Sequence, residues 1–214
     1  MDVSEVREQR ILVLVEGEPD AYVWSTAGGF SSAILFGMAG VAGHAAAAHE
    51  RGKRIKEAVD LDTELLLSRK VSSQLSEDYS INADRFCTAG EDAETNGCIA
   101  PPADFDSLQK QYGGDLVLLI KPFEMGIRDQ KPYIAVIAGL LDIDSEKWVW
   151  QNAYGASHKE IYVEGKNWRK WEDDNAALND CLEGQLETIV DEISCSCVEG
   201  VPEKIEGDPL VVYM

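Results

Sequence analysis

The pattern of apolar and polar positions divides the chain into buried strands, amphipathic helices and polar loops. Residues 133–143 are apolar at nearly every position, so they present two apolar faces and are predicted to form a strand near the middle of a sheet. The next run alternates, with Trp148 and Trp150 expected on one face. The polar residues 144–147 between the runs predict a tight turn, which makes the segment 133–152 a β-hairpin.

Other segments have the pattern of shorter strands. Residues 10–15 and 115–123 are apolar and bounded by turn residues, which is typical of buried strands. Residues 79–87 can form a further short strand. Residues 20–28, which contain Tyr22 and Trp24, are expected to be an irregular link.

Helices are predicted between these strands. A helical pattern begins at Ala45, and a second run follows with Asp60 or Asp62 as its cap. Asp104 is expected to cap a short helix that ends at Gly113. In the last helix, apolar residues recur every three or four positions, so one face is expected to pack on the sheet; they are Leu178, Leu182, Leu186, Ile189 and Ile193.

These elements predict an α/β (α+β) fold: a mixed central β-sheet with a hairpin at 133–152, packed against long helices in a single domain. Residues 1–9 are expected to be a flexible N-terminus, and residues 10–194 form the single α/β domain. Residues 195–214 are expected to be a C-terminal tail in which Leu210–Tyr213 can add an edge strand.

The stretch 25–49 contains no Asp, Glu, Lys or Arg and is the most hydrophobic window of the chain. A helix packed on the sheet, an oligomerisation or partner surface, and a membrane-spanning helix are three interpretations of it. Its richness in glycine and alanine makes membrane insertion marginal. The candidate interface residues in this stretch are Phe30, Ile34, Leu35, Met38 and Val41.

The charge balance limits the classes of partner. The chain has 214 residues, with 19 basic and 39 acidic ones, for a formal net charge of −20. Nucleic acids and anionic lipid headgroups need a cationic surface, so neither is an expected partner. The expected partners are proteins or further copies of this chain.

Five cysteines bear on the compartment. Cys87 and Cys98 flank a polar loop, and a disulfide between them would stabilise the chain by about 3 kcal/mol. This pairing favours an oxidising compartment, although a cytoplasmic protein can have the same sequence.

Catalytic motifs give no strong signal. The sequence contains no phosphate-binding loop, no nucleophile elbow and no zinc-protease motif, and we expect no cofactor and no metal. Asp142 and Asp144 lie two apart and are a candidate acid pair for a hydrolase, although a solvated turn is the favoured interpretation. A second candidate site is a set of four tryptophans, Trp148, Trp150, Trp168 and Trp171. These residues can line a groove that binds a glycan or a peptide, or they can form a packing cluster over a sheet edge.

The hairpin also resembles a known pattern. The segment from Leu141 to Trp150 is similar to the L-x-D-x-x-T-G-x-x-x-W hairpin of envelope lipoproteins related to the curli-export lipoprotein and the N-terminal domain of the Tol-system propeller protein. Asp142, Ser145 in the Thr place and Trp150 match, whereas Glu146 stands where that pattern has Gly.

The resemblance implies an α/β sandwich of a mixed sheet and helices over residues 10–193. It further implies a non-enzymatic protein that is tethered by a lipidated cysteine, is periplasmic or outer-membrane-anchored, and supports envelope assembly. It transfers no catalytic residue. The predicted function is therefore a periplasm-facing, lipoprotein-like domain that acts through protein–protein contacts or oligomerisation, with contact to a membrane only through a lipid anchor outside this chain. The alternatives are the tryptophan-based binding module and the acid-pair hydrolase.

Overall fold

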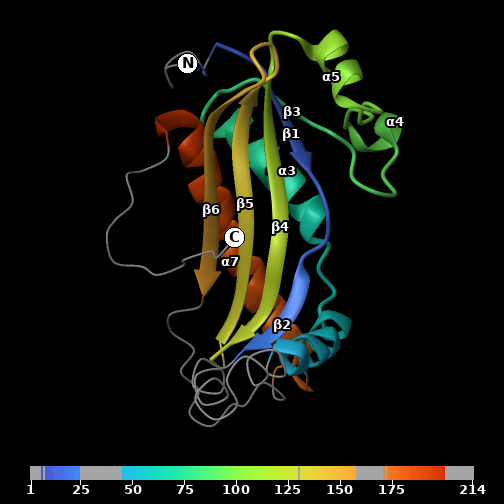
Figure 1. Cartoon of the computed structure of the whole chain (residues 1–214), viewed down its shortest axis with the longest axis vertical. Helices are drawn as coiled ribbons and strands as arrows, with labels where there is room; N and C mark the ends of the chain where they lie inside the picture. Colours follow the sequence, from blue (N-terminus) through green and yellow to red (C-terminus); the bar gives the residue numbers. More distant parts are fainter. Residues whose placement is uncertain are drawn as a thin grey trace.

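The computed structural model describes residues 6, 8–24, 45–129, 131–157, 171 and 173–200. Within these ranges a six-stranded mixed sheet is backed by long helices (Figure 1). The strands are β1 (Ile11–Val15), β2 (Asp20–Trp24), β3 (Ala83–Arg85), β4 (Leu116–Arg128), β5 (Lys131–Asp142) and β6 (Lys147–Ser157). The helices are one over residues 45–58, α3 (Thr63–Glu77), α4 (Ala93–Asn96), α5 (Phe105–Tyr112) and α7 (Asn175–Glu199).

The long strand β4 organises the sheet. The strand order is β3-β1-β4-β5-β6, and β2 also pairs with β4. β1 pairs in parallel with residues 116–120 of β4 and β2 with residues 124–128, so β1 and β2 lie end to end along one side of it. On the other side β4, β5 and β6 run antiparallel. The predicted hairpin and the mixed-sheet, single-domain α/β fold are thereby confirmed.

Aspartates cap the N-termini of α3, α4, α5 and α7. The Asp62 carboxylate accepts a hydrogen bond from the Leu65 N–H at 2.9 Å and so caps α3, and Asp104 caps α5 in the same way through Ser107 at 2.8 Å. Such caps satisfy N–H groups that have no partner inside the helix. Asp92 and Asp174 cap α4 and α7 in the same way. Part of the acidic excess of the chain therefore serves to define helix ends.

Helices α3 and α7 cover one face of the sheet, which we call the helix-covered face; both lie behind the strands in Figure 1. The larger hydrophobic core lies between them and the sheet. The predicted apolar positions of α7 all belong to this core and are fully buried: Leu178, Leu182, Leu186, Ile189 and Ile193. Burial of this apolar stripe, rather than intrinsic helix propensity, is what holds α7 in place.

The opposite face of the sheet, which we call the open face, is covered over a smaller area than the helix-covered face. A second apolar cluster lies there beneath α5 and consists of Leu12, Phe86, Leu108, Val117 and Ile143. α4 and α5 project at one upper corner of the molecule, on the side of β3 and β1 (Figure 1). Along β5 and β6 this face carries exposed side chains.

Three elements differ from the sequence prediction. Residues 20–24, expected in an irregular link, form β2 and pair with residues 124–128, which extend β4 beyond its expected end. This pairing needs a glycine, because a Cβ at Gly126, where φ is +144°, would lie 1.9 Å from the Tyr22 carbonyl oxygen. α7 continues to Glu199, so it extends past residue 194, where the C-terminal tail was expected to begin, and residues 201–214 lie outside the described residues.

Candidate functional site

The two tryptophans of the hairpin point to opposite faces of the sheet. Leu140 pairs with Trp150 but Leu141 pairs with Trp148, so β6 contains one extra residue, Val149, at this point. Such a bulge shifts the alternation of side chains by one. The expectation that Trp148 and Trp150 share a face was wrong for this reason.

Trp150 belongs to the helix-covered face. It is 8% exposed and packs edge-to-face against Tyr154, with ring centroids 6.4 Å apart. Trp171 is also buried in the same core. Trp168 lies outside the described residues. The three described tryptophans therefore do not line one groove, and a ligand site on this hairpin would have to rely on Trp148.

Trp148 lies on the open face and is 43% exposed. Its ring lies over Gly139, where an added Cβ would come within 2.7 Å of it. Ile137, two residues along the same face of β5, is 40% exposed. The neighbouring positions of β4 and β6 complete what we call the open-face patch, which consists of Leu119, Lys121, Ile137, Gly139, Trp148, Gln151 and Ala153. The patch contains no acidic residue.

The sequence prediction did not identify Ile137. In the sequence it lies in a run that is apolar on both faces, and such a run predicts burial throughout. Its exposure results from the end of the α5 cover, which is a tertiary feature. Gly139 was the available signal, because a glycine in a strand often marks a place where another group approaches the backbone closely.

The acid pair of the hairpin serves the turn. The Asp142 carboxylate accepts hydrogen bonds from the Asp144 N–H at 3.1 Å and from the Ser145 hydroxyl at 2.7 Å. These bonds, the one from Ser145 first, lower the pKa of Asp142. Glu146 follows with a φ of +54°, a left-handed conformation that favours glycine. Asp142 and Ser145 therefore have a structural role in the turn, and Glu146 occupies the position where the resembling pattern has Gly.

A buried ion pair supports the loop between the two disulfide-bonded cysteines. Cys87 and Cys98 are bonded, as predicted, with their Cα atoms 5.0 Å apart. Glu91 lies in this loop, and its carboxylate contacts the guanidinium of Arg85, the last residue of β3, at 2.6 Å; the two side chains are 7% and 6% exposed. Hydrogen bonds from Arg85, from the Thr88 backbone and from Arg69 hold the pKa of Glu91 far below its usual range. The loop is thus both covalently and electrostatically fixed.

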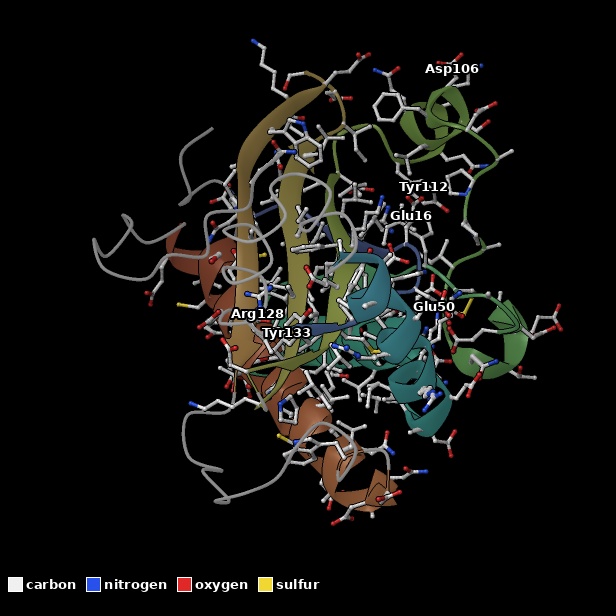
Figure 2. All side chains as sticks on the ribbon, turned by 60° about the horizontal axis from the view of Figure 1, so that its bottom comes forward. Glu16, Glu50, Asp106, Tyr112, Arg128 and Tyr133 are labelled. Carbon is white, nitrogen blue, oxygen red and sulfur yellow. A yellow bond between two sulfur atoms is a disulfide. The ribbon has the colours of Figure 1, made fainter. Side chains whose placement is uncertain are left out.

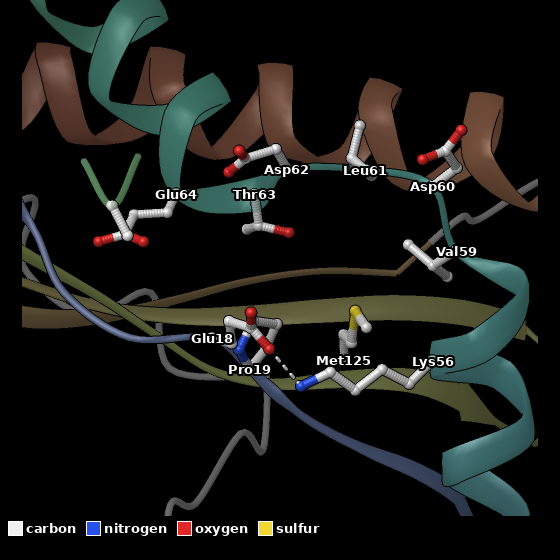
Figure 3. A pocket seen from close by; sticks show the side chains of 11 residues that line it. Glu18, Pro19, Lys56, Val59, Asp60, Leu61, Asp62, Thr63, Glu64 and Met125 are labelled. Carbon is white, nitrogen blue, oxygen red and sulfur yellow. Dashed lines mark hydrogen bonds and ion pairs between the residues drawn. The ribbon is translucent and has the colours of Figure 1, made fainter. Parts of the chain in front are cut away.

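A cavity of about 370 Å³ opens where β1 ends and α3 begins (Figure 3). Its lining includes the apolar side chains of Leu61 and Met125 and four carboxylates, which are Glu18, Asp60, Asp62 and Glu64. Lys56 contacts Glu18 at 2.6 Å beside Met125 (Figure 3). Burial, followed by the charge of Asp62, raises the pKa of Glu64.

The cavity is rich in carboxylates, but its lining residues do not form a recognisable catalytic arrangement. Among the described residues that line it, Thr63 is the one with a hydroxyl side chain, and none is a histidine or a cysteine. Over the part of the chain that the structure describes, no group of three or more His, Cys, Asp or Glu side chains is placed to hold a metal ion. We assign no reaction to this cavity.

A polar cluster lies at the far end of the open face. The Tyr133 hydroxyl donates a hydrogen bond to the Glu124 carboxylate, and the Arg128 guanidinium lies over the Tyr133 ring, 4.5 Å from its centroid. Figure 2 shows Arg128 and Tyr133 side by side near the end of the hairpin. Burial, then the bond to Glu124, raises the pKa of Tyr133 well above its usual range. The phenol therefore stays protonated and acts as a hydrogen-bond donor.

The candidate interface from the charge-free stretch lies outside the described residues. Phe30, Ile34, Leu35, Met38 and Val41 all belong to it, so the interface remains a prediction. The part of the stretch that is described, residues 45–49, begins a helix. None of the helices in the described ranges has the length and apolar character needed to cross a membrane.

Comparison with known proteins gives structural neighbours alone. No protein-family model matches the chain, and no curated protein matches it. The hypothetical protein CT253 from Chlamydia trachomatis is similar at 11% identity and a TM-score of 0.44, over 88% of this chain and 98% of that one.

Two further solved structures are similar. The lipoprotein GNA1162 from Neisseria meningitidis has 13% identity and a TM-score of 0.37, over 80% of this chain and 96% of that one. The C-terminal domain of LpoB from Salmonella enterica has 11% identity and a TM-score of 0.23, over 73% and 93%. None of these three is a curli-export or Tol-system protein by its name. Likenesses at this level do not assign a function.

Proposed function

We propose that this chain is a non-enzymatic domain of the bacterial cell envelope that acts through protein–protein contact at the open-face patch. The observation that carries the proposal is the exposure of Trp148 and Ile137 together on one face of the sheet. Exposed large apolar side chains that gather on one surface are typical of interaction sites.

The composition of the patch supports a protein partner. Tryptophan is enriched among the residues that contribute most to protein interfaces, and acidic residues are depleted from interface centres. The patch has Trp148 and no Asp or Glu, in a chain with a net charge of −20. The polar ends of Lys121 and Gln151 give it a rim that can make hydrogen bonds.

The disulfide supports the envelope part of the proposal. Bonds such as that between Cys87 and Cys98 form and persist in oxidising compartments, of which the periplasm is one. The hairpin resemblance, carried by Asp142, Ser145 and Trp150, favours the same setting. The disulfide and the resemblance together favour a periplasm-facing domain that is held at the outer membrane by a lipid anchor.

The proposal is tested by placing a photo-crosslinking amino acid at Trp148 in the cells that naturally produce the chain. We expect defined adducts at this position, and none with the same group at Asp180, an exposed residue of α7 on the opposite side of the sheet. Trp148→Ser should abolish adducts formed from a group at Ala153. Equal labelling at Trp148 and Asp180, or no adduct at either, would contradict a specific contact surface.

The charge-free stretch supports a second, separate contact surface. We propose that Phe30, Ile34, Leu35, Met38 and Val41 mediate self-association or partner binding. Leu35→Glu and Met38→Glu should then lower the mass measured by light scattering, while Trp148→Ser should not. If Leu35→Glu and Met38→Glu change neither the mass nor the adducts formed from a crosslinking group at Trp148, these five residues are not a contact surface.

A further inference from the structure

The cavity where β1 ends and α3 begins contains a hydroxyl group without a hydrogen-bond partner. Thr63, the first residue of α3, lines this cavity and is only 5% exposed. Figure 3 shows its side chain directed from the start of the helix into the space that faces Pro19 and Met125. Within the described ranges, no group makes a hydrogen bond with the Thr63 hydroxyl. Buried polar groups in proteins normally have such a partner, so this hydroxyl has capacity left for a ligand.

The charge around this hydroxyl is negative. The carboxylates of Glu18, Asp60, Asp62 and Glu64 line the cavity, and Lys56 is the one basic residue among the described residues of its lining. The N-terminus of α3 adds about half a positive charge. One ammonium group and this helix dipole do not balance four carboxylates. The cavity therefore favours a cationic ligand over an anion.

The two glutamates of the cavity differ in what they already contact. The Lys56 ammonium lies 2.6 Å from the Glu18 carboxylate, so Glu18 has a counter-charge. In the described part of the chain, no basic side chain forms an ion pair with Glu64. Burial raises the pKa of Glu64, and the neighbouring carboxylates, that of Asp62 first, raise it further. A cation bound beside Glu64 would offset this repulsion.

The arrangement suits an organic cation better than a metal ion. Over the described residues, no three His, Cys, Asp or Glu side chains lie close enough together to hold a metal. Val59, Leu61 and Met125 add apolar surface to the lining, which can contact the methylene groups of an organic ligand. The volume of about 370 Å³ lies near the lower end of the range of about 300–1,000 Å³ that is typical of small-ligand sites.

We propose that this cavity binds a guanidinium group that is carried on a short apolar chain, as in arginine. A guanidinium has five N–H donors in a planar fork and no acceptor, so it matches carboxylate and hydroxyl oxygens. It donates to the Glu64 carboxylate and to the Thr63 hydroxyl, and its methylene groups contact Met125. The group belongs either to an arginine of a partner protein or to a free small molecule. This site is separate from the open-face patch and does not depend on the proposed function.

The test is a titration of the full, isotope-labelled chain with the tripeptide acetyl-Gly-Arg-Gly-amide. The backbone amide signals of Thr63 and Glu64 are expected to shift and saturate. A salt concentration of about 0.15 M, at which the screening length is about 8 Å, suppresses general attraction to a chain of net charge −20. The same tripeptide with citrulline is neutral and has nearly the same shape, so it should cause no shift. The lysine tripeptide should bind more weakly by several-fold, and agmatine represents the free small molecule.

Four variants locate the binding. Thr63→Val should weaken binding of the arginine tripeptide by on the order of tenfold, because it removes a hydrogen bond to a charged group. It should not lower the melting temperature, since the hydroxyl has no partner in the free chain. Glu64→Gln should weaken binding at least as much. Glu57→Gln removes the same charge from an exposed residue outside the cavity lining and should have no effect. Lys56→Gln removes the cation that competes for Glu18 and should tighten binding several-fold, which damage to the fold would not do.

The titrations also define what overturns the proposal. A lack of saturation with both the arginine tripeptide and agmatine would remove the site. Equal binding of the citrulline or lysine tripeptide would contradict recognition of a guanidinium. Equal losses in Glu64→Gln and Glu57→Gln would show attraction to the net charge alone. Tighter binding of the tripeptide than of agmatine assigns the group to a partner protein, and the reverse order assigns it to a small molecule.

Discussion

The two faces of the hairpin are covered by different means. On the helix-covered face, α3 and α7 bury Trp150 and Tyr154 in one continuous apolar core. On the open face a short helix and a loop fixed by a disulfide and a buried ion pair cover one corner, and Trp148 and Ile137 stay in water. The helix-covered face contributes most of the buried apolar core. The open face is covered at one corner only, so part of its apolar surface stays exposed to solvent.

The largest expected effect lies on the helix-covered face. Trp150→Ala should lower the free energy of unfolding by about 3–5 kcal/mol, because it removes a large buried ring and leaves a cavity. Urea denaturation measures the change. Trp150→Phe is the control and should cost much less, since the Trp150 indole N–H is buried without a hydrogen-bond partner. Equal losses in the two variants would show that the indole N–H contributes to stability.

The next largest effect lies in the cover of the open face. Glu91→Gln should lower the free energy of unfolding by about 3 kcal/mol, because Arg85 would remain buried without its counter-charge. Glu94→Gln changes an exposed glutamate of the same loop and should have almost no effect. A similar loss in both variants would argue against a special role for the Arg85 pair.

The same pair predicts a pH dependence. The pKa of Glu91 is lowered on folding, from an ordinary value of 4.5, so its contribution to stability is complete above about pH 4.5 and is lost as the pH falls towards the folded-state pKa. The stability difference between the native chain and Glu91→Gln should therefore be largest near neutral pH and shrink in acid. Denaturation curves from pH 7 to pH 3 measure it, and a difference that grows in acid would contradict the assignment.

The turn that joins the two strands predicts a gain. Glu146 has a φ of +54°, which costs a residue with a side chain about 1 kcal/mol relative to glycine. Glu146→Gly should therefore raise the free energy of unfolding by about that amount. Glu146→Gln removes the charge but keeps the conformational cost, so it should change little. A gain in the glutamine variant would point to charge repulsion instead.

Local patterns in the sequence predicted most of the fold. The hairpin, the buried strands and the caps Asp62 and Asp104 each depend on residues close together in the chain, and the structure contains them. The disulfide was predicted because Cys87 and Cys98 flank one short loop.

The features that the sequence did not predict depend on distant partners. β2 exists because residues 124–128 of β4 extend to meet it. The choice of Glu91 as the partner of Arg85, among 39 acidic residues, is made by the tertiary structure. The bulge at Val149 turns the Trp148 side chain to the face opposite that of Trp150. A prediction that assumes strict alternation along a strand cannot reveal such an insertion. The bulge explains why Trp148 was grouped with Trp150, and the end of the α5 cover explains why the exposure of Ile137 was missed.

A coupling between two substitutions tests the open face itself. Gly139→Ala should destabilise the chain by about 1–2 kcal/mol, because the new Cβ would meet the Trp148 ring at 2.7 Å and the Gln151 side chain at 2.9 Å. Once Trp148 is replaced by alanine, much of this penalty should disappear. The two substitutions are therefore coupled by about 1 kcal/mol, which a double-mutant cycle in urea measures. Additive losses would mean that Trp148 does not lie over Gly139, and the open-face patch would then lack its central contact.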